Sequence, residues 1–242
     1  MQTIGRNWNG MPTIVNNKLE NGVLFENTLA GFGTIILDKD FIDEMILIAN
    51  DVQKSDSFMS MLFSIHNKVN DYFRSDNINN QSREQTYANN EVIDEDGMII
   101  GTKISSLKGK NIAKCSEKSI ATYIILEKLY EIGRITRKPS LVLSQLTTEQ
   151  SKNEPHAFVM LNKESNDPTK HLIFDVENPT LVEDNLGKEQ FFAGIYSLTD
   201  DEYNNLLNGY SCTPTSLYEI VGDYKEIGEK RTYGNIELDK KK

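Results

Sequence analysis

The sequence has little of what would point to a metal centre, a disulfide framework or a membrane anchor. Its 242 residues include three histidines and two cysteines, which do not cluster at the spacings of metal ligands. Two cysteines are too few for a disulfide framework, so a reducing compartment is favoured. No run of about 18 apolar residues and no glycine-rich phosphate loop occurs. We therefore expect no metal, no cofactor and no membrane insertion.

Positive charge is also in the minority. The formal net charge is −10, from 36 acidic and 26 basic residues. An acidic chain repels phosphate backbones, so we expect no nucleic-acid partner. Residues 1–17 lack the apolar segment of a secretory signal. The chain is therefore expected to be cytoplasmic, or secreted by a route without a classical signal peptide.

The N-terminal half predicts two helices and one long polar segment. Residues 1–38 mix asparagine, glycine and short apolar runs, and we interpret them as an irregular lead-in. Apolar residues recur at helical spacing in 41–52 and again in 57–73, which predicts a helix in each range. Residues 75–98 are almost entirely polar and predict a long loop, either a disordered insertion or a flap beside a cleft.

The C-terminal half changes to a strand pattern. Strands are predicted at 140–146, 156–162, 171–177 and 191–198, and the short linkers between them favour antiparallel neighbours. A helix is predicted at 199–207, and the charged tail from residue 222 is expected to fray. Because no repeat or domain linker is visible, we interpret residues 1–242 as a single α+β domain.

The stretch from Asn111 to Ile132 places a cysteine at the start of a long apolar helix. Apolar residues cover most of the helix circumference, which indicates a buried helix, and Gly133 follows as the expected C-terminal cap. Cys115 then lies in the first turn, where unpaired N–H groups and the helix dipole favour a thiolate. Lys108, Lys110 and Lys114 add positive charge nearby. The alternative is that Cys115 is a small buried hydrophobic residue.

A thiol nucleophile needs a base, and the base needs an orienting group. His156 begins one predicted strand, and Asp175 lies near the end of the next. If these strands are antiparallel neighbours, His156 and Asp175 lie side by side, so that the carboxylate orients the imidazole and the imidazole serves Cys115. Asp167, in an Asp-Pro turn, and Glu177, further along the strand, are alternative orienting groups.

The remaining histidines and the second cysteine are interpreted as structural. His171 precedes Asp175 by four residues on the same predicted strand, which places the two about 13 Å apart. It is therefore expected to be a surface residue at the strand end. His66, inside the second helix, is expected at the surface or at the core boundary. Cys212, in a turn-like stretch, is expected to be an inert or semi-exposed thiol.

The order of these residues resembles a known family. The segments KCSEKS (114–119), PHAFVML (155–161) and HLIFDVENPT (171–180) resemble the cysteine, histidine and aspartate motifs of the transglutaminase-like superfamily of papain-like folds. The match covers roughly residues 57–200. Ala113 replaces a frequent glycine, Phe158 a frequent tryptophan, and DVENPT a shorter D-x-T segment, which leaves the subfamily open.

The resemblance implies a papain- or transglutaminase-like fold with N-terminal helices, a buried helix that carries the cysteine, and an antiparallel sheet. It also implies that Cys115 is the nucleophile, His156 the base and Asp175 its orienting group, with a thioester intermediate formed from a protein or peptide amide. The Cys115 N–H would bind the oxyanion together with a second donor. Gln81, Gln85, Tyr87 and Asn111 are the candidates for that donor.

Three functions remain after this comparison. The first is a thiol enzyme, a protease, deamidase or transglutaminase, with hydrolysis or deamidation as the default because water is always present. The second is a noncatalytic protein-binding domain of the same fold, and the third an acyltransferase of the arylamine N-acetyltransferase type. The abundance of Asn, Ile and Lys is typical of an AT-rich, bacterial genome, and a bacterial enzyme of this class could be a delivered effector. The sequence does not address the oligomeric state.

Overall fold

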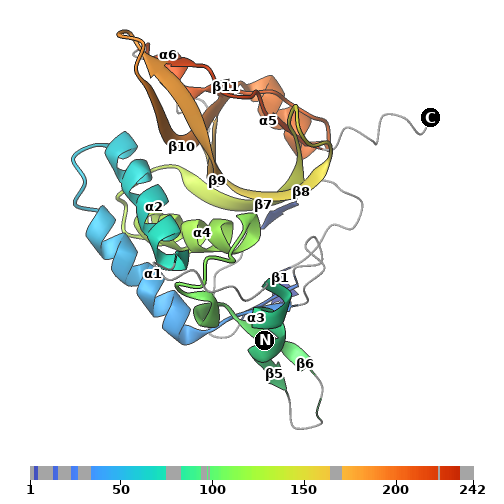
Figure 1. The fold of residues 1–242 in the computed structure, drawn as a ribbon. Helices are drawn as coiled ribbons and strands as arrows, with labels where there is room; N and C mark the ends of the chain where they lie inside the picture. Colours follow the sequence, from blue (N-terminus) through green and yellow to red (C-terminus); the bar gives the residue numbers. More distant parts are fainter. Residues whose placement is uncertain are drawn as a thin grey trace.

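The computed structural model is a mixed α and β structure built around a curled antiparallel sheet (Figure 1). The mixture of helices with an antiparallel sheet is as the sequence predicts. The residues that the structure describes are 3–4, 13–15, 23–26, 34–74, 83–93, 97, 99–163, 171–222 and 224–234.

The helices largely follow the predicted ranges. They are α1 Lys39–Val52, α2 Phe58–Phe73, α3 Arg83–Asn89, α4 Cys115–Glu131, α5 Asp200–Leu207 and α6 Leu217–Val221, with a 3-10 turn at Ile104–Leu107. The predictions for α1, α2, α4 and α5 are confirmed to within two residues at each end. The prediction of a long loop over 75–98 is wrong for its described part, because α3 and the strand β5 Glu91–Ile93 form there.

The large sheet contains all four predicted strands. They are β7 Lys138–Thr147, β8 Glu154–Asn162, β9 His171–Asp184 and β10 Glu189–Leu198, and each pairs antiparallel with the next. Short strands extend the sheet: β11 Thr215–Ser216 beside β10, β12 Tyr224–Glu226 beside β9, and β13 Thr232–Tyr233 and β2 Thr13–Val15 beside β7.

Helix α4 lies across one face of the curled sheet, with α1 and α2 beside it (Figure 1). It contacts β7, β8 and β9, so most of its circumference is covered. The predicted buried helix is confirmed: Ile120, Ile125 and Leu129 are almost completely inaccessible to solvent, although Ile132, just past its end, is 44% exposed. Burial of each such aliphatic side chain contributes about 1.5–3 kcal/mol to the stability of the folded state.

The two faces of the sheet serve two separate cores. Val159 and Leu161 of β8 point to the α4 side, whereas Phe158 and Met160 point to the inner, concave side, where they join Tyr233. This alternation follows from the two-residue period of a strand. Polar side chains on the inner face are consequently close to a second apolar core.

A second, smaller sheet and the C-terminal strands correct two predictions. The small sheet has the order β1-β3-β4-β6-β5, with β1 Thr3–Ile4, β3 Val23–Glu26, β4 Thr34–Leu37 and β6 Ile99–Lys103. Short parts of the expected irregular lead-in therefore form strands. The tail was expected to fray from residue 222, but its described part forms β12 and β13; the residues after 234 lie outside the described part. Strands of two to four residues show no reliable period, and pairing with longer neighbours stabilises them.

Within the described ranges, none of the helices combines the length and the apolar character that a transmembrane segment requires.

Candidate active site

Cys115 is the first residue of α4. Lys114 before it has an extended backbone, with φ −118° and ψ −164°, so the chain enters the helix abruptly at the cysteine. The Cys115 side chain is partly exposed, and its thiol is free of any disulfide. The N–H groups of the first helical turn have no acceptor within the helix, and the positive end of the helix dipole lies there. The thiol thus lies where negative charge is favoured.

His156 lies near the start of β8 and is only 4% exposed. Its Nε2 is 2.8 Å from Oδ2 of Asp175, which leaves Nδ1 for the thiol of Cys115. Burial by itself lowers the pKa of His156, but the charge of Asp175 and hydrogen bonds to Asp175 and Cys115 outweigh burial and raise the pKa to about 10. The predicted neighbourhood of His156 and Asp175 is confirmed, and the three predicted residues meet in one place.

Asp175 is completely buried and accepts several hydrogen bonds. Oδ1 accepts the backbone N–H groups of Glu177 and Asn178, each at 3.2 Å. Oδ2 accepts the His156 imidazole, the Asn178 amide at 3.1 Å and the Tyr233 hydroxyl at 2.9 Å. Burial raises the pKa of Asp175, but the His156 charge and these hydrogen bonds outweigh it and hold the pKa below its ordinary value. The carboxylate is therefore fixed in position and in its charged form.

The sequence analysis missed Tyr233, which lies in the part of the tail expected to fray. Strand β13 pairs with β7 opposite Leu146 and Thr147, and this pairing carries the Tyr233 hydroxyl to Asp175. The ring centroid lies 6.2 Å from that of His156 and 5.0 Å from that of Phe158. A two-residue strand in a charged segment gives no sequence signal for this contact.

Asn178 and Gly194 complete the support of the carboxylate. The Asn178 amide lies 3.3 Å from Nε2 of His156 and donates to Asp175, so it covers the bond between the two side chains. The backbone of β9 turns sharply here, and its register with β10 shifts between Phe192 and Gly194. A Cβ atom at Gly194 would clash with the backbone oxygens of Asp175 and Asn178, so only glycine fits without movement.

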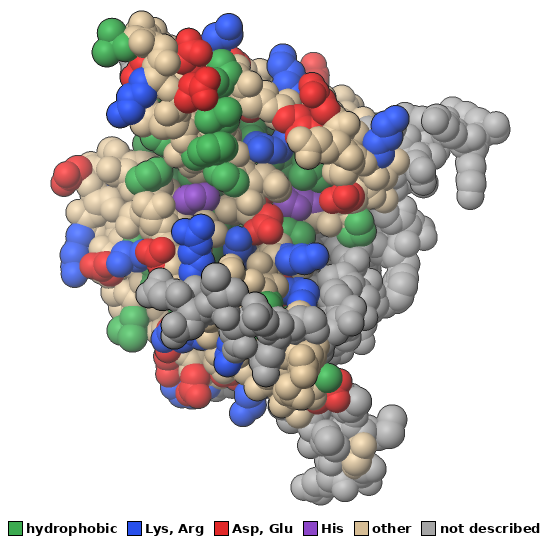
Figure 2. All heavy atoms as spheres, in the orientation of Figure 1, with side chains coloured by type: hydrophobic (Ala, Val, Ile, Leu, Met, Phe, Trp, Pro, Cys, Tyr) green, Lys and Arg blue, Asp and Glu red, His purple; other side chains and the backbone are tan. Residues whose placement is uncertain are grey.

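A cavity of about 490 Å³ lies at Cys115 and His156. Its lining comes from the start of α4, the start of β8 and the bend of β9: Lys114, Cys115, Ser116, Leu146, Glu154, Pro155, His156, Ala157, Glu177 and Asn178. A second cavity of about 500 Å³ shares Glu177 with the first and extends along α2. On the face drawn in Figure 2, histidine side chains lie between a hydrophobic group above and Lys and Arg side chains below.

Of the four candidates for the second oxyanion donor, the three that the structure describes do not line this cavity. Gln81 lies outside the described residues, and Gln85 is exposed on α3. The Tyr87 hydroxyl donates to Glu117, and Asn111 lines the second cavity. The backbone N–H groups of the first turn of α4 are the donors that lie beside Cys115.

Of the two alternative orienting groups, only Glu177 lies in the described part of the chain, and its charge is directed to a lysine. Glu177 forms an ion pair with Lys118 at the boundary between the two cavities. Asp167 lies outside the described residues. Asp175 is therefore the candidate that contacts the imidazole.

The prediction that His171 is a surface residue is wrong. It is 6% exposed, and its ring stacks on that of Tyr203 with a centroid distance of 3.6 Å. Burial and the nearby positive charge of Lys163 lower its pKa to about 4, although the charge of Asp200 opposes the shift. The packing of α5 against the strand end covers this histidine, which the strand pattern alone did not predict.

His66 and Cys212 are the other two residues that the sequence analysis set aside. His66 is half-buried on α2, where the Asn70 amide donates to its carbonyl at 3.0 Å, so the boundary position is confirmed. Cys212 is only 6% exposed, so it is not semi-exposed. Burial raises the pKa of the Cys212 thiol to about 12, with a smaller effect of the Glu202 charge, which fits an inert thiol.

No group of three or more His, Cys, Asp or Glu side chains in the described part of the chain is arranged to hold a metal ion.

Comparison with known proteins adds no assignment: no family model, no curated protein and no solved structure matches this chain.

Proposed function

We propose that the chain is a thiol-dependent acyl-transfer enzyme that acts on protein or peptide amides. In this proposal Cys115 is the nucleophile, His156 the general base and Asp175 its orienting group. The observation that carries it is a half-buried thiol at a helix N-terminus, in contact with an imidazole whose other nitrogen is 2.8 Å from a buried carboxylate. These residues have the mutual geometry that an activated nucleophile requires.

The arrangement accounts for each step of acyl transfer. His156 Nδ1 accepts the proton of the Cys115 thiol, and the thiolate attacks the amide carbonyl carbon. The resulting oxyanion lies against the first-turn N–H groups of α4. The imidazolium then donates its proton to the leaving amine as the C–N bond breaks, and a thioester remains. Water, deprotonated by His156, releases the acid and restores the thiol.

The fold is compatible with the papain- and transglutaminase-like arrangement that the motifs resemble. The cysteine begins the helix that lies across the sheet, and the histidine and aspartate come from neighbouring antiparallel strands. We therefore include a papain/transglutaminase-like fold in the proposal. Hydrolysis or deamidation is favoured over transamidation because the partly exposed thiol is accessible to water.

The two other functions have less support. A protein-binding domain has no need for a buried carboxylate that accepts five hydrogen bonds next to a histidine and a thiol. An acetyltransferase that uses coenzyme A needs cations for the phosphate groups of its donor. The described lining of the cavity at Cys115 has Lys114 beside the carboxylates of Glu154 and Glu177, which is unfavourable for such a donor.

The test is the pH dependence of alkylation of Cys115 by iodoacetamide, in a Cys212→Ser background. We expect rapid labelling at pH 6, because the thiolate pairs with a protonated His156, and at least a 10-fold slower reaction in His156→Ala. Folding of each variant is checked by circular dichroism. Screening with peptide amides, with detection of released ammonia and of new peptide ends, then separates deamidation from proteolysis.

The contrary outcome is equally clear. The enzyme proposal would be contradicted if labelling began only near pH 8.5, the pKa of a free thiol, and were equally fast in the wild type and in His156→Ala. That result would favour a binding domain.

A further inference from the structure

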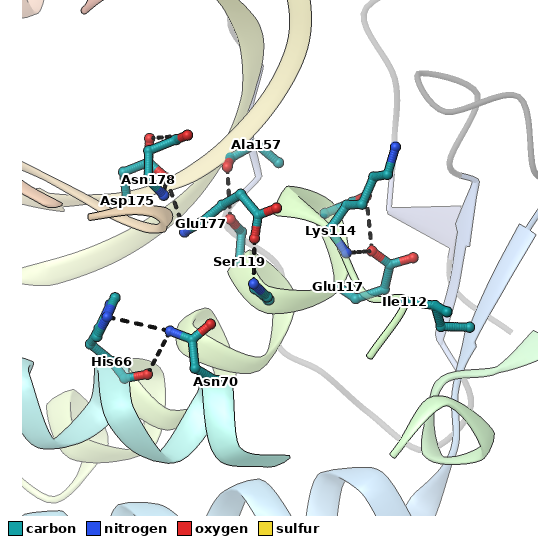
Figure 3. A network of polar contacts seen from close by, with 12 residues as sticks. His66, Asn70, Ile112, Lys114, Glu117, Ser119, Ala157, Asp175, Glu177 and Asn178 are labelled. Carbon is teal, nitrogen blue, oxygen red and sulfur yellow. Dashed lines mark hydrogen bonds and ion pairs between the residues drawn. The ribbon is translucent and has the colours of Figure 1, made fainter. Parts of the chain in front are cut away.

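Glu117 is a fully buried carboxylate two residues after Cys115, and the proposed reaction does not use it. Its Oε2 accepts the backbone N–H of Lys114 at 3.0 Å. Figure 3 shows Lys114 and Glu117 facing each other at the start of α4. This bond links the residue before Cys115 to the one two positions after it, so it restrains the turn that holds the thiol.

The other oxygen of Glu117 is held from α3. Oε1 accepts hydrogen bonds from Arg83 and from the Tyr87 hydroxyl. Arg83 also donates through Nη1 to the carbonyl of Ile112 at 2.6 Å. The same guanidinium therefore ties the segment before Cys115 to the helix after it. Its side chain is only 9% exposed, so water screens the ion pair weakly.

Several other charges surround the thiol. His156 and Glu154 approach from β8, and Glu177 from β9, with its charge paired by Lys118 of α4. Lys114 lines the same cavity from the segment before α4. The Arg83–Glu117 pair differs from these because both charges are buried and lie behind the helix turn. Neither Arg83 nor Glu117 lines the cavity, so a change to one partner replaces no lining residue.

We propose that Arg83 and Glu117 form a positioning ion pair that fixes the first turn of α4 and sets the electrostatic potential at the Cys115 thiol. The proposal rests on the proposed function, because it concerns the reactivity of that thiol. Glu117 lies two residues after Cys115 and contacts the opposite charge of Arg83, so the effects of the two charges on the thiol oppose each other. Loss of one of them changes the net charge near the thiol by one unit in a weakly screened environment.

The test uses the sign of the shift, which a purely structural role would not reproduce. Arg83→Met leaves the carboxylate unpaired, so the midpoint of the alkylation–pH curve should rise by about one pH unit. Glu117→Gln removes the negative charge and keeps the positive charge of Arg83, so the midpoint should fall by a similar amount. The double variant should return to within about 0.3 pH units of the wild type, because both charges are gone.

Glu127→Gln is the matched control. Glu127 also lies on α4 and also accepts a tyrosine hydroxyl, that of Tyr123 at 3.0 Å, but it is almost three turns further along the helix. We expect its curve to coincide with that of the wild type. Thermal unfolding of each variant is measured in parallel, so that a loss of stability is recorded separately from the shift of the midpoint.

Shifts of the same sign in the two single variants, or unshifted curves, overturn the proposal. If Arg83→Met does not fold, the nearly isosteric Glu117→Gln decides by itself, because an unshifted or raised midpoint contradicts the inference. The proposed function fails by a different result: the wild type is not labelled at pH 6, and its labelling rate equals that of His156→Ala. A wild type that labels at pH 6 with variants that do not shift refutes the ion pair alone.

Discussion

The two cysteines of this chain are the same residue in opposite surroundings. Cys115 begins a long helix, is partly exposed, and contacts the imidazole of His156. The backbone of Cys212 forms an isolated antiparallel β-bridge with Tyr233. Its side chain is 6% exposed, and burial raises the pKa of its thiol to about 12. The sulfur chemistry is the same, so the difference comes from the neighbours: a helix N-terminus and a held imidazole on one side, an apolar core on the other.

The largest expected effect comes from removing the negative charge of Asp175, which holds the imidazole beside Cys115. In Asp175→Asn the pKa of His156 should fall from about 10 toward its ordinary value near 6.5. Protonated His156 then persists only to about neutral pH, and Cys115 should resemble Cys212 more closely. We expect amide hydrolysis to fall about 10²–10⁴-fold, measured with a peptide amide at pH 8.

The sign of the pH dependence provides the check on this variant. Because the folded-state pKa of His156 is raised, its contribution to stability is fully present below about pH 6.5 and is lost as the pH rises through about 10. Denaturant unfolding between pH 6 and 10 should show this loss in the wild type and not in Asp175→Asn. Equal pH dependence of the two proteins would contradict the role of Asp175.

A smaller effect is expected when Tyr233, which belongs to the core on the inner face of the sheet, loses its hydrogen bond to Asp175. Tyr233→Phe removes the hydroxyl that donates to Asp175 at 2.9 Å and keeps the ring. The loss of this buried bond should reduce the free energy of unfolding by about 1–3 kcal/mol and slow Cys115 alkylation a few-fold. Since the pKa of Asp175 is depressed, its contribution to stability is present above about pH 4 and is lost as the pH falls through the folded-state pKa. Without the hydroxyl this pKa is depressed less, so the acid loss of stability should be smaller and should be complete at a higher pH.

Tyr196→Phe is the control for Tyr233→Phe. Tyr196 is buried in the same core, but its hydroxyl contacts Thr180 at 2.9 Å and Arg231 instead of Asp175. We expect a comparable loss of stability at neutral pH without the slower alkylation. Alkylation that slows equally in both variants would show that general loosening of the core, and not the bond to Asp175, is responsible.

The smallest effect is expected at the second cysteine. Cys212→Ser should leave the labelling of native protein and the amide hydrolysis unchanged, because the buried thiol does not react at neutral pH. A hydroxyl in this apolar site should cost about 1 kcal/mol of stability, measured by urea unfolding. Mass spectrometry after labelling should find one modified thiol in native wild-type protein and two after unfolding. Two modified thiols in the native state would remove the contrast between the cysteines.

The parts of the site that the sequence predicted are those carried by long, periodic elements. The apolar surface of α4 and the strand patterns around His156 and Asp175 are strong local signals, and they place these residues correctly. An antiparallel pair of strands then brings the end of one beside the start of the next. The catalytic roles assigned to the three residues remain predictions.

The parts that were missed depend on contacts between distant segments. Helix α3 has only seven residues, and what fixes it is the bonding of Arg83 and Tyr87 to Glu117, roughly 30 positions away. Tyr233 reaches Asp175 because a two-residue strand pairs with β7. Neither contact has a period or a motif in the sequence, and short helices and strands gain most of their stability from tertiary packing.

The pairing of β13 with β7 can form only after β13 has been synthesised, long after the residues of α4. A ribosome releases a chain from its N-terminus at about 5–20 residues per second. Roughly 120 residues separate Cys115 from Tyr233, so the nascent thiol precedes the tyrosine that supports Asp175 by about 6–24 s. During translation, therefore, the sulfur of the proposed nucleophile is synthesised well before Tyr233, which contacts the acid beside the proposed base.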